Sequence, residues 1–490
     1  MSLLLLAALA VPSAVLVVSL RRWFTPVPWR IALLFFVMSL VFLHGAVFTG
    51  KLPVPVDEIV RGYPYVGITG EPSVRNPLTN DTVKLFLPWM AVAREELGAF
   101  RAPLWNRYSF SGYPLLANGE SAPFSPFFLA TIFVPLPGQI VAMAGLKIFV
   151  SLLFGYLFVR RVGASEAAAC FAATAFAWSV FQTVFLYYST TAVTALLPAA
   201  LYAILVAQQE GSRRGMVLVA LVVASLMANG HPESVLHIAI VAAGLLAVDV
   251  ALASDRRAWL RNFRTPLAGA VAGLALSAPA WVPVLEQVLP SSRLAELRRV
   301  GGHPAMYPLT AAWAMISPNG FGNPLRQNWS WILNYSSVAT SYTGLVVLVL
   351  AVTAALGRRT GSRERLWLLF AVLLWLVAMS WSPLGRGLNA LPPFSFVAND
   401  KLRFGAIFIA AAVAAVTVDR LRARRSATLM IATVAVVALA LFVFKARPHM
   451  VRPSDLVPPI AVAAFMVTAI AWRRAAPAAA FLAVAVELFT

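Results

Sequence analysis

The chain has 490 residues, of which 60% are hydrophobic and 12% are charged, and its mean hydropathy is +0.80. Soluble globular chains are about 45–50% apolar and about 25% charged, so this composition excludes a soluble enzyme and indicates a polytopic membrane protein. The net charge of +20 first suggests a nucleic-acid partner. In a membrane protein, however, cationic loops serve to orient the helices. With a single cysteine, Cys170, an intrachain disulfide is also excluded.

Fourteen apolar segments approach the length of about 20 residues that a membrane-spanning helix needs. Two of them fill residues 1–50, and the others lie within 139–490. The segments are 2–20, 31–50, 139–159, 167–187, 191–208, 215–229, 234–253, 266–289, 337–356, 366–382, 404–418, 427–444, 457–472 and 477–490. The expected fold is an all-α bundle of about 12 to 14 transmembrane helices.

Every second connection between these segments is short and rich in arginine. The seven connections are 21–30, 160–161, 213–214, 256–264, 358–365, 420–425 and 473–474, and they carry 21 of the 39 lysine and arginine residues. The positive-inside rule places them in the cytoplasm. Both termini and the longer loops are therefore expected on the outer face.

The longest outer loop is 51–138, followed by loops near 290–336, 383–403 and 445–456. Loops of this length are usually functional or disordered, and these are too rich in aromatic residues and proline to be disordered. In the first loop, apolar residues from Val83 to Leu97 recur at helical spacing, which predicts an amphipathic helix on the membrane surface. Residues 102–126 are dense in glycine, proline and asparagine, which predicts a fixed, packed loop.

Asp81 is the first candidate for chemistry, because a carboxylate just above the bilayer can act as a general base toward a sugar hydroxyl. The alternative is that it caps the surface helix. Asp57 and Glu58 are candidates for a second carboxylate or for ligands of a divalent metal such as Mg or Mn. A solvated acidic pair fits them equally well, and the five histidines form no metal-binding motif.

Two further groups lie at predicted outer helix ends. His231 and Glu233 either line a site or close a turn. Lys401 and Arg403 lie on the side that the positive-inside rule leaves poor in cations, so they suit a lipid phosphate. Snorkelling toward lipid head groups is the alternative for this pair.

Several spaced motifs together carry a family resemblance. They are Asn76-Pro-Leu-Thr-Asn-Asp81, Phe86-Leu-Pro-Trp89, Pro103-Leu-Trp-Asn106, Gly112-Tyr-Pro-Leu-Leu-Ala-Asn118 and Pro123-Phe-Ser-Pro126, with thinner matches at Gly230-His-Pro-Glu233 and from Asn399 to Arg403. In this order they resemble the first outer loop of the YfhO family of bacterial membrane proteins, which is similar to GT-C glycosyltransferases. Members commonly continue into an outer domain after the last helix, whereas this sequence ends at Thr490; either this member is short or the sequence is truncated.

The resemblance implies a glycosyltransferase of the bacterial inner membrane with its active site on the extracytoplasmic face. It implies a polyprenyl-phosphate sugar donor, membrane lipid around the helices and a glycan, lipid or protein acceptor of the cell envelope; no nucleic acid is expected. Asp81 would be the catalytic base, and Lys401 and Arg403 would bind the donor phosphate. A transporter or flippase for a lipid-linked solute and a non-catalytic assembly protein remain alternatives. Residues expected to line the substrate are Trp105, Asn106, Tyr113, Asn118, Glu120, His231 and Glu233.

Overall fold

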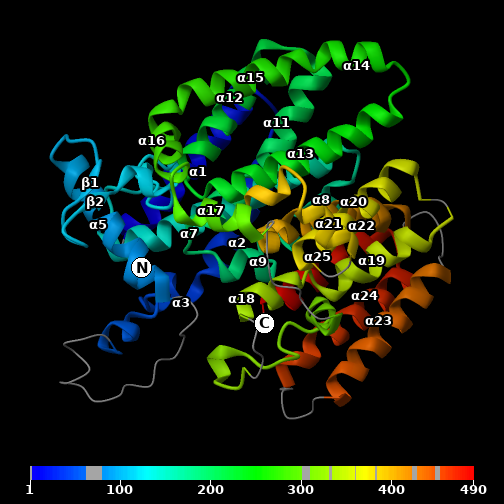
Figure 1. Cartoon of the computed structure of the whole chain (residues 1–490). Helices are drawn as coiled ribbons and strands as arrows, with labels where there is room; N and C mark the ends of the chain where they lie inside the picture. The colour runs from blue at the N-terminus through cyan, green and yellow to red at the C-terminus, as the bar shows by residue number, and fades with distance from the viewer. Residues whose placement is uncertain are drawn as a thin grey trace.

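The computed structural model describes residues 3–61, 80–300, 309–329, 334–358, 360–380, 383–421, 427–446 and 453–489. The regular structure of these residues is almost entirely helical (Figure 1). The sheet in this part of the chain is a hairpin of two-residue strands, β1 (Trp105–Asn106) and β2 (Tyr113–Pro114).

Five described helical segments are long and apolar enough to cross a membrane: Leu3–Trp23, Leu136–Arg161, Ser189–Glu210, Pro232–Leu252 and Asn399–Leu421. Three pairs of helices pass the same test together but are bent by 77°, 53° and 80° at a short break, and four further apolar helices are shorter. Each of these lies on a segment predicted from the sequence. The protein is therefore an all-α polytopic membrane protein, although length alone supports five to eight spans rather than fourteen.

The N-terminal part and the first loop form short elements around one long helix. In chain order they are α1 (Leu3–Trp23), α2 (Trp29–Phe42), α3 (His44–Thr49), η1 (Val56–Arg61), η3 (Thr82–Phe86), α5 (Leu87–Gly98), η4 (Leu116–Asn118) and α6 (Pro126–Leu129). The hairpin and α5 lie at the left edge of the view in Figure 1, away from the C-terminal helices. The predicted loop helix is present as α5, and its Met90 and Ala93 pack against Leu115 and Phe128.

The core of the bundle is formed by α7 (Leu136–Arg161), α8 (Glu166–Ala177) and α22 (Arg403–Leu421). Helix α7 is apolar on all sides, and a helix of that kind is buried by its neighbours. The ring of Phe408 on α22 lies 5.4 Å from that of Phe158 and 5.0 Å from that of Phe176. These aromatic contacts join all three helices.

The remaining helices surround this core. They are α9 (Val180–Val184), α10 (Ser189–Thr194), α11 (Leu197–Glu210), α12 (Arg213–Ala228), α13 (Pro232–Leu252), α14 (Arg256–Asn262), α15 (Arg264–Leu276), α16 (Ala278–Val288), α17 (Ser292–Val300), α18 (Tyr335–Val338), α19 (Leu345–Leu356), α20 (Ser362–Met379), α21 (Pro383–Asn389), α23 (Ala427–Ala446), α24 (Val457–Ala471) and α25 (Ala476–Phe489). Short 3-10 helices connect them: η5 (Leu309–Met315), η6 (Pro324–Arg326), η7 (Ala339–Ser341), η8 (Phe394–Phe396), η9 (Asn399–Leu402), η11 (Pro453–Leu456) and η12 (Arg473–Ala475).

Helices α12 and α15 lie side by side along the top of Figure 1 and approach each other closely. The contact is made by Gly269 and Gly273, which are four residues apart and therefore on one face of α15. A Cβ atom on Gly269 would lie 2.6 Å from the carbonyl oxygen of Met216, and one on Gly273 would lie 2.6 Å from that of Ala220. Small residues at this spacing allow helix backbones to pack tightly in membranes.

Six of the seven arginine-rich connections lie at one end of the bundle. Arg30 pairs with Glu166 at 2.8 Å, Arg161 with Glu210 at 3.0 Å, and Arg420 with Glu364 at 2.9 Å. Arg161, Trp259 and Arg363 together line a cavity of about 250 Å³ at the same end. The described residues of these basic connections therefore gather at one end of the molecule.

Candidate active site

Asp81 lies inside a helical segment rather than at its start. Asn80 and Asp81 are already helical, the backbone of Asp81 has φ −57° and ψ −29°, and its side chain makes no capping hydrogen bond. The alternative role of Asp81 as a helix cap is therefore wrong. Its carboxylate is exposed, and the five residues after it form the π-helical turn η3. Such turns often occur at functional sites.

Tyr188 is the neighbour that Asp81 and Glu120 share. Burial and the negative charges of Asp81 and Glu120 raise the pKa of the Tyr188 phenol above its ordinary value. The ring of Tyr188 lies 5.1 Å from that of Phe86, on the turn that follows Asp81. The turn before α10 thus carries a tyrosine to the two carboxylates of the first loop.

A buried lysine holds this turn in place. Lys147, on the core helix α7, is 3% exposed, and its ammonium donates hydrogen bonds to the carbonyl oxygens of Leu186 at 2.9 Å and Tyr188 at 3.0 Å. A buried polar group needs such partners. Lys147 is therefore a structural residue that positions Tyr188.

The first loop packs directly on the start of α13. Asn118 accepts hydrogen bonds from the backbone N–H groups of Glu120 at 2.8 Å and Ser121 at 2.7 Å, which fixes a tight turn. The carbonyl oxygen of Gly119 then accepts a hydrogen bond of 2.8 Å from the N–H of His231. Gly230 is required there, because a Cβ atom would lie 2.3 Å from that oxygen.

His231 and Lys401 present two hydrogen-bond donors to the same space. His231 is buried and caps α13, with its Nδ1 accepting a hydrogen bond of 3.2 Å from the N–H of Ser234. In a neutral imidazole the other nitrogen, Nε2, then carries the hydrogen. This Nε2 lies 3.3 Å from the ammonium of Lys401, which can only donate. An anion that lies against both nitrogens would accept from both groups.

The position of Lys401 is fixed by the buried residue Asn399. The side-chain amide of Asn399 donates to Asn389 and to the carbonyl oxygen of Phe394, each at 2.7 Å, and its oxygen lies 3.3 Å from Nε2 of His237. These contacts attach η9 to α13 and α21. Glu233, two residues after His231, is half-buried in the first turn of α13.

Arg403 lies in a different environment from Lys401. It is 1% exposed, and its Nε donates to the carbonyl oxygen of Asp400 at 2.6 Å. Its Nη1 donates to the carbonyl oxygen of Ser337 and to the hydroxyl of Ser341. This geometry favours a role in joining η9 to η7 over phosphate binding, which stays a prediction for Arg403.

Glu58 is buried and forms an ion pair of 3.2 Å with Lys84 on η3, so it is not part of a solvated acidic pair. Asp57 is half-buried on the same 3-10 helix. In the described part of the chain, no group of three or more His, Cys, Asp or Glu side chains is arranged to hold a metal ion. These carboxylates therefore do not form a ready metal site in the described part of the chain.

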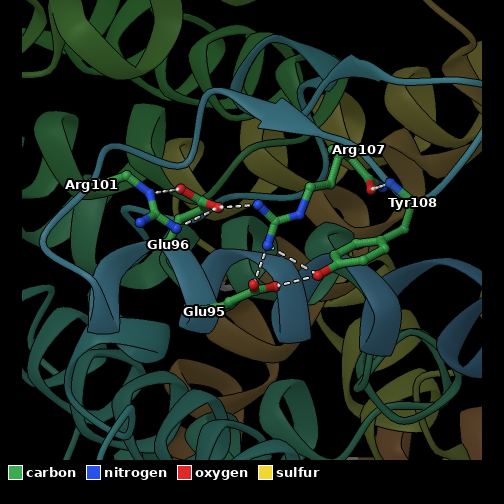
Figure 2. A network of polar contacts seen from close by, with 6 residues as sticks. Glu95, Glu96, Arg101, Arg107 and Tyr108 are labelled. Atoms are coloured by element: carbon green, nitrogen blue, oxygen red, sulfur yellow. Dashed lines mark hydrogen bonds and ion pairs between the residues drawn. The ribbon is translucent and has the colours of Figure 1, made fainter.

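The hairpin residues are held by a polar network above α5 (Figure 2). Arg107 pairs with Glu95, and the hydroxyl of Tyr108 donates to Glu95 at 2.9 Å. Asn106 is buried and accepts a hydrogen bond from the N–H of Tyr108, which gives it a structural role in the hairpin. The ring of Trp105 is about half exposed, and Tyr113 accepts a hydrogen bond from Trp89.

The structure thus gathers Asp81, Asn118, Glu120, His231 and Lys401 at one end of the bundle, through Tyr188 and the contact of the first loop with α13. Trp105, Asn106 and Tyr113 belong to the adjacent hairpin. Tyr188 was not singled out from the sequence. The sequence feature that could have identified Tyr188 is its position in the short gap between two predicted spans.

Fold and composition define an all-helical, multi-pass membrane protein with a structured first loop. No family model and no curated protein matches the chain. Among solved structures, the chain is similar to the cryo-EM structure of the arabinofuranosyltransferase AftD from Mycobacteria, with 17% identity and a TM-score of 0.40 over 75% of this chain and 25% of that one. The chain therefore spans about a quarter of the length of that protein. A likeness at this level carries no information on substrate or site residues, and the resemblance to the YfhO family stays a prediction.

Proposed function

We propose that the protein is a membrane glycosyltransferase that moves a sugar from a polyprenyl-phosphate donor to an acceptor outside the bacterial inner membrane. The observation that carries the proposal is the pair of donors, His231 and Lys401, beside a first loop that presents Asp81 and Glu120. The pair of His231 and Lys401 suits a phosphate, and the carboxylate of Asp81 suits the proton of a hydroxyl group.

An oxygen of the donor phosphate would lie against both His231 Nε2 and Lys401 Nζ, which are 3.3 Å apart. Both nitrogens donate hydrogen bonds, and charge-assisted hydrogen bonds to a phosphate are strong. The first turn of α13 begins at Pro232, so the positive end of the helix dipole adds to this attraction. The lipid chain would remain among the apolar helices while the phosphate reaches the end of the bundle.

Asp81 would take the proton from the acceptor hydroxyl as its oxygen attacks the anomeric carbon of the sugar. The bond between that carbon and the phosphate oxygen breaks, and its electron pair leaves with the polyprenyl phosphate. The negative charge on the departing phosphate grows in the transition state, where Lys401 and His231 stabilise it. The products are the glycosylated acceptor, polyprenyl phosphate and a proton on Asp81.

The test is transfer of labelled sugar by the purified chain in lipid nanodiscs, comparing the wild type with Asp81→Asn. General-base catalysis contributes about 10²–10⁴-fold to such reactions, so we expect a loss of that order for Asp81→Asn. Asp255→Asn is the matched control, because Asp255 caps α14 at the opposite end and asparagine caps a helix equally well.

Equal transfer by the wild type and Asp81→Asn would remove Asp81 from the mechanism. If the wild type transfers no sugar but carries a lipid-linked solute across liposome membranes, the transporter reading would replace the proposal.

A further inference from the structure

A second cavity lies between the turn that carries Tyr188, the segment around η6 and the C-terminal helix α25. It has a volume of about 330 Å³, at the lower end of the range of about 300–1,000 Å³ found for small-ligand sites. Its lining includes Trp178, Tyr187, Asn319 and Tyr335. Tyr187 and Tyr188 are consecutive residues, so one turn contributes to both this cavity and the neighbourhood of Asp81.

One wall of the cavity is a fixed polar group. Arg326 forms two parallel hydrogen bonds to Asp455, at 2.9 and 3.1 Å, and the amide of Asn319 donates to the same carboxylate at 3.0 Å. Arg326 and Asp455 are only 12% and 8% exposed. Planar groups held rigidly in this way offer hydrogen bonds in set directions.

The charge of the lining disfavours an anion. Among the described lining residues Arg326 is the one cation, and Asp455 already pairs with it. Glu487 adds a further carboxylate to the wall. A phosphate or carboxylate ligand would therefore meet repulsion, whereas a neutral ligand with several hydroxyl groups would not.

The other walls are aromatic and contain a buried donor. Trp178 is 4% exposed and lies 5.4 Å from the ring of Phe42 and 5.9 Å from that of Phe489. Its Nε1 has no hydrogen-bond partner in the described part of the chain. A buried N–H without a partner is unfavourable, and a ligand hydroxyl can supply the missing acceptor. Tyr187 and Tyr335 add aromatic surface.

We infer that this cavity binds a neutral sugar unit of the acceptor glycan, with its hydroxyl groups on Asn319 and Asp455 and one ring face against the aromatic wall. The inference rests on the proposed function for the role of that glycan. A saccharide combines a partly apolar ring face with a rim of hydroxyl groups, and the cavity combines aromatic rings with fixed, charge-balanced polar groups.

The experiment measures binding of methyl glycosides of common pentoses and hexoses to the chain in nanodiscs by saturation-transfer NMR. The main variant is Thr183→Phe, because Thr183 lines the cavity and is exposed, so a larger side chain fills the cavity without entering the core. Thr49→Phe is the control: Thr49 is also exposed and does not line the cavity. A second variant, Asn319→Ala, removes the polar contact.

At least one glycoside is expected to bind the wild type and Thr49→Phe equally, and to bind Thr183→Phe and Asn319→Ala at least tenfold more weakly. Inorganic phosphate is expected not to compete. Absence of glycoside binding, equal binding by Thr183→Phe, or displacement of the glycoside by phosphate would each overturn the inference.

Failure of the inference and failure of the proposed function give different results. Asp81→Asn is expected to lose transfer while keeping glycoside binding. A wild-type protein that binds glycosides through this cavity but transfers no sugar would contradict the proposed function alone. One that transfers sugar without measurable glycoside binding would contradict the cavity assignment alone.

Discussion

Lys401 and Arg403 are two residues apart, yet their side chains are expected to respond differently to substitution. Lys401 is half-buried and faces His231, whereas Arg403 is buried against backbone oxygens of α18 and η9. We expect Lys401→Met to weaken donor binding and transfer at least tenfold while leaving the thermal midpoint unchanged. Donor titration and thermal unfolding of the same preparations test both halves of this prediction.

Arg403→Met is the contrasting variant. Hydrogen bonds to a charged group contribute about 1.5–3 kcal/mol each, so loss of this buried guanidinium should lower the thermal midpoint clearly. If Arg403→Met is as stable as the wild type but binds the donor poorly, Arg403 would instead be a residue that binds the donor phosphate.

The sequence suggested these two cations as a pair because it shows their type and spacing but not their neighbours. Two of the partners of Arg403, Ser337 and Ser341, lie more than 60 residues away. For Asp81 the sequence predicted the helical location, and its catalytic role stays a prediction. Its place on a helix follows from local apolar spacing, although the structure puts it within the helix rather than at its start.

At the scale of elements, the packing of α12 on α15 depends on two glycines of one helix face. Gly273→Ala places a methyl group 2.6 Å from a carbonyl oxygen, so the helices must separate. Overpacking of this kind typically costs about 1–3 kcal/mol. We expect a lower midpoint in thermal unfolding.

The control for this prediction is Gly45→Ala. A Cβ on Gly45, within α3, meets no atom within 4 Å, so the change should be neutral or slightly stabilising through helix propensity. A similar loss at both positions would show that the close contact of α12 with α15 is not the cause.

The β1–β2 hairpin is held to α5 by exposed ion pairs rather than by a large apolar contact. Arg107→Ala removes the contacts with Glu95 and Tyr108, and we expect faster amide exchange over 105–114 with little change in global stability. Arg107→Lys should restore part of the protection. Unchanged exchange in Arg107→Ala would contradict this role.

The hairpin should also loosen in acid. The hydrogen bond from Arg101 lowers the pKa of Glu96, so the stabilisation that this ion pair provides is present above the ordinary pKa of a glutamate and is lost as the pH falls through the lowered value. Amide exchange of the hairpin measured across that pH range, corrected for intrinsic rates, tests this.

Helix positions were predictable because each predicted apolar segment coincides with helical structure. The bends were not predictable. The break of 77° after Leu276 lies inside a continuous apolar run, and its direction is set by contacts of α15 with α12 and of α16 with η4, which local hydropathy does not contain.

At the scale of the whole molecule, the clustering of arginine-rich connections at one end predicts which sites face the cytoplasm. The chain has one cysteine, the buried Cys170, so Cys170→Ala gives a background without thiols. In intact cells, an impermeant maleimide should label Phe110→Cys on the hairpin, where Phe110 is 93% exposed. It should label Arg257→Cys on α14 only after permeabilisation. The opposite pattern would reverse the predicted orientation.

The candidate site itself was only partly predictable at this scale. Composition and loop length predict a site at the end of the bundle that carries the first loop, and the roles predicted for its residues stay predictions. What the sequence does not contain is the contact of Gly119 with His231, over 100 residues apart, or the function of Lys147 as the anchor of the turn at Tyr188.

That turn makes binding at the candidate active site and binding in the cavity lined by Tyr187 thermodynamically dependent on each other. Tyr187 and Tyr188 share one short backbone segment, and the carbonyl oxygens of Leu186 and Tyr188 share one ammonium. A ligand that shifts the turn from one side changes the free energy of binding on the other side by the same amount in either order. Occupancy by glycan and by polyprenyl phosphate would then be coupled, so that the protein would bind its two substrates as a linked pair rather than independently.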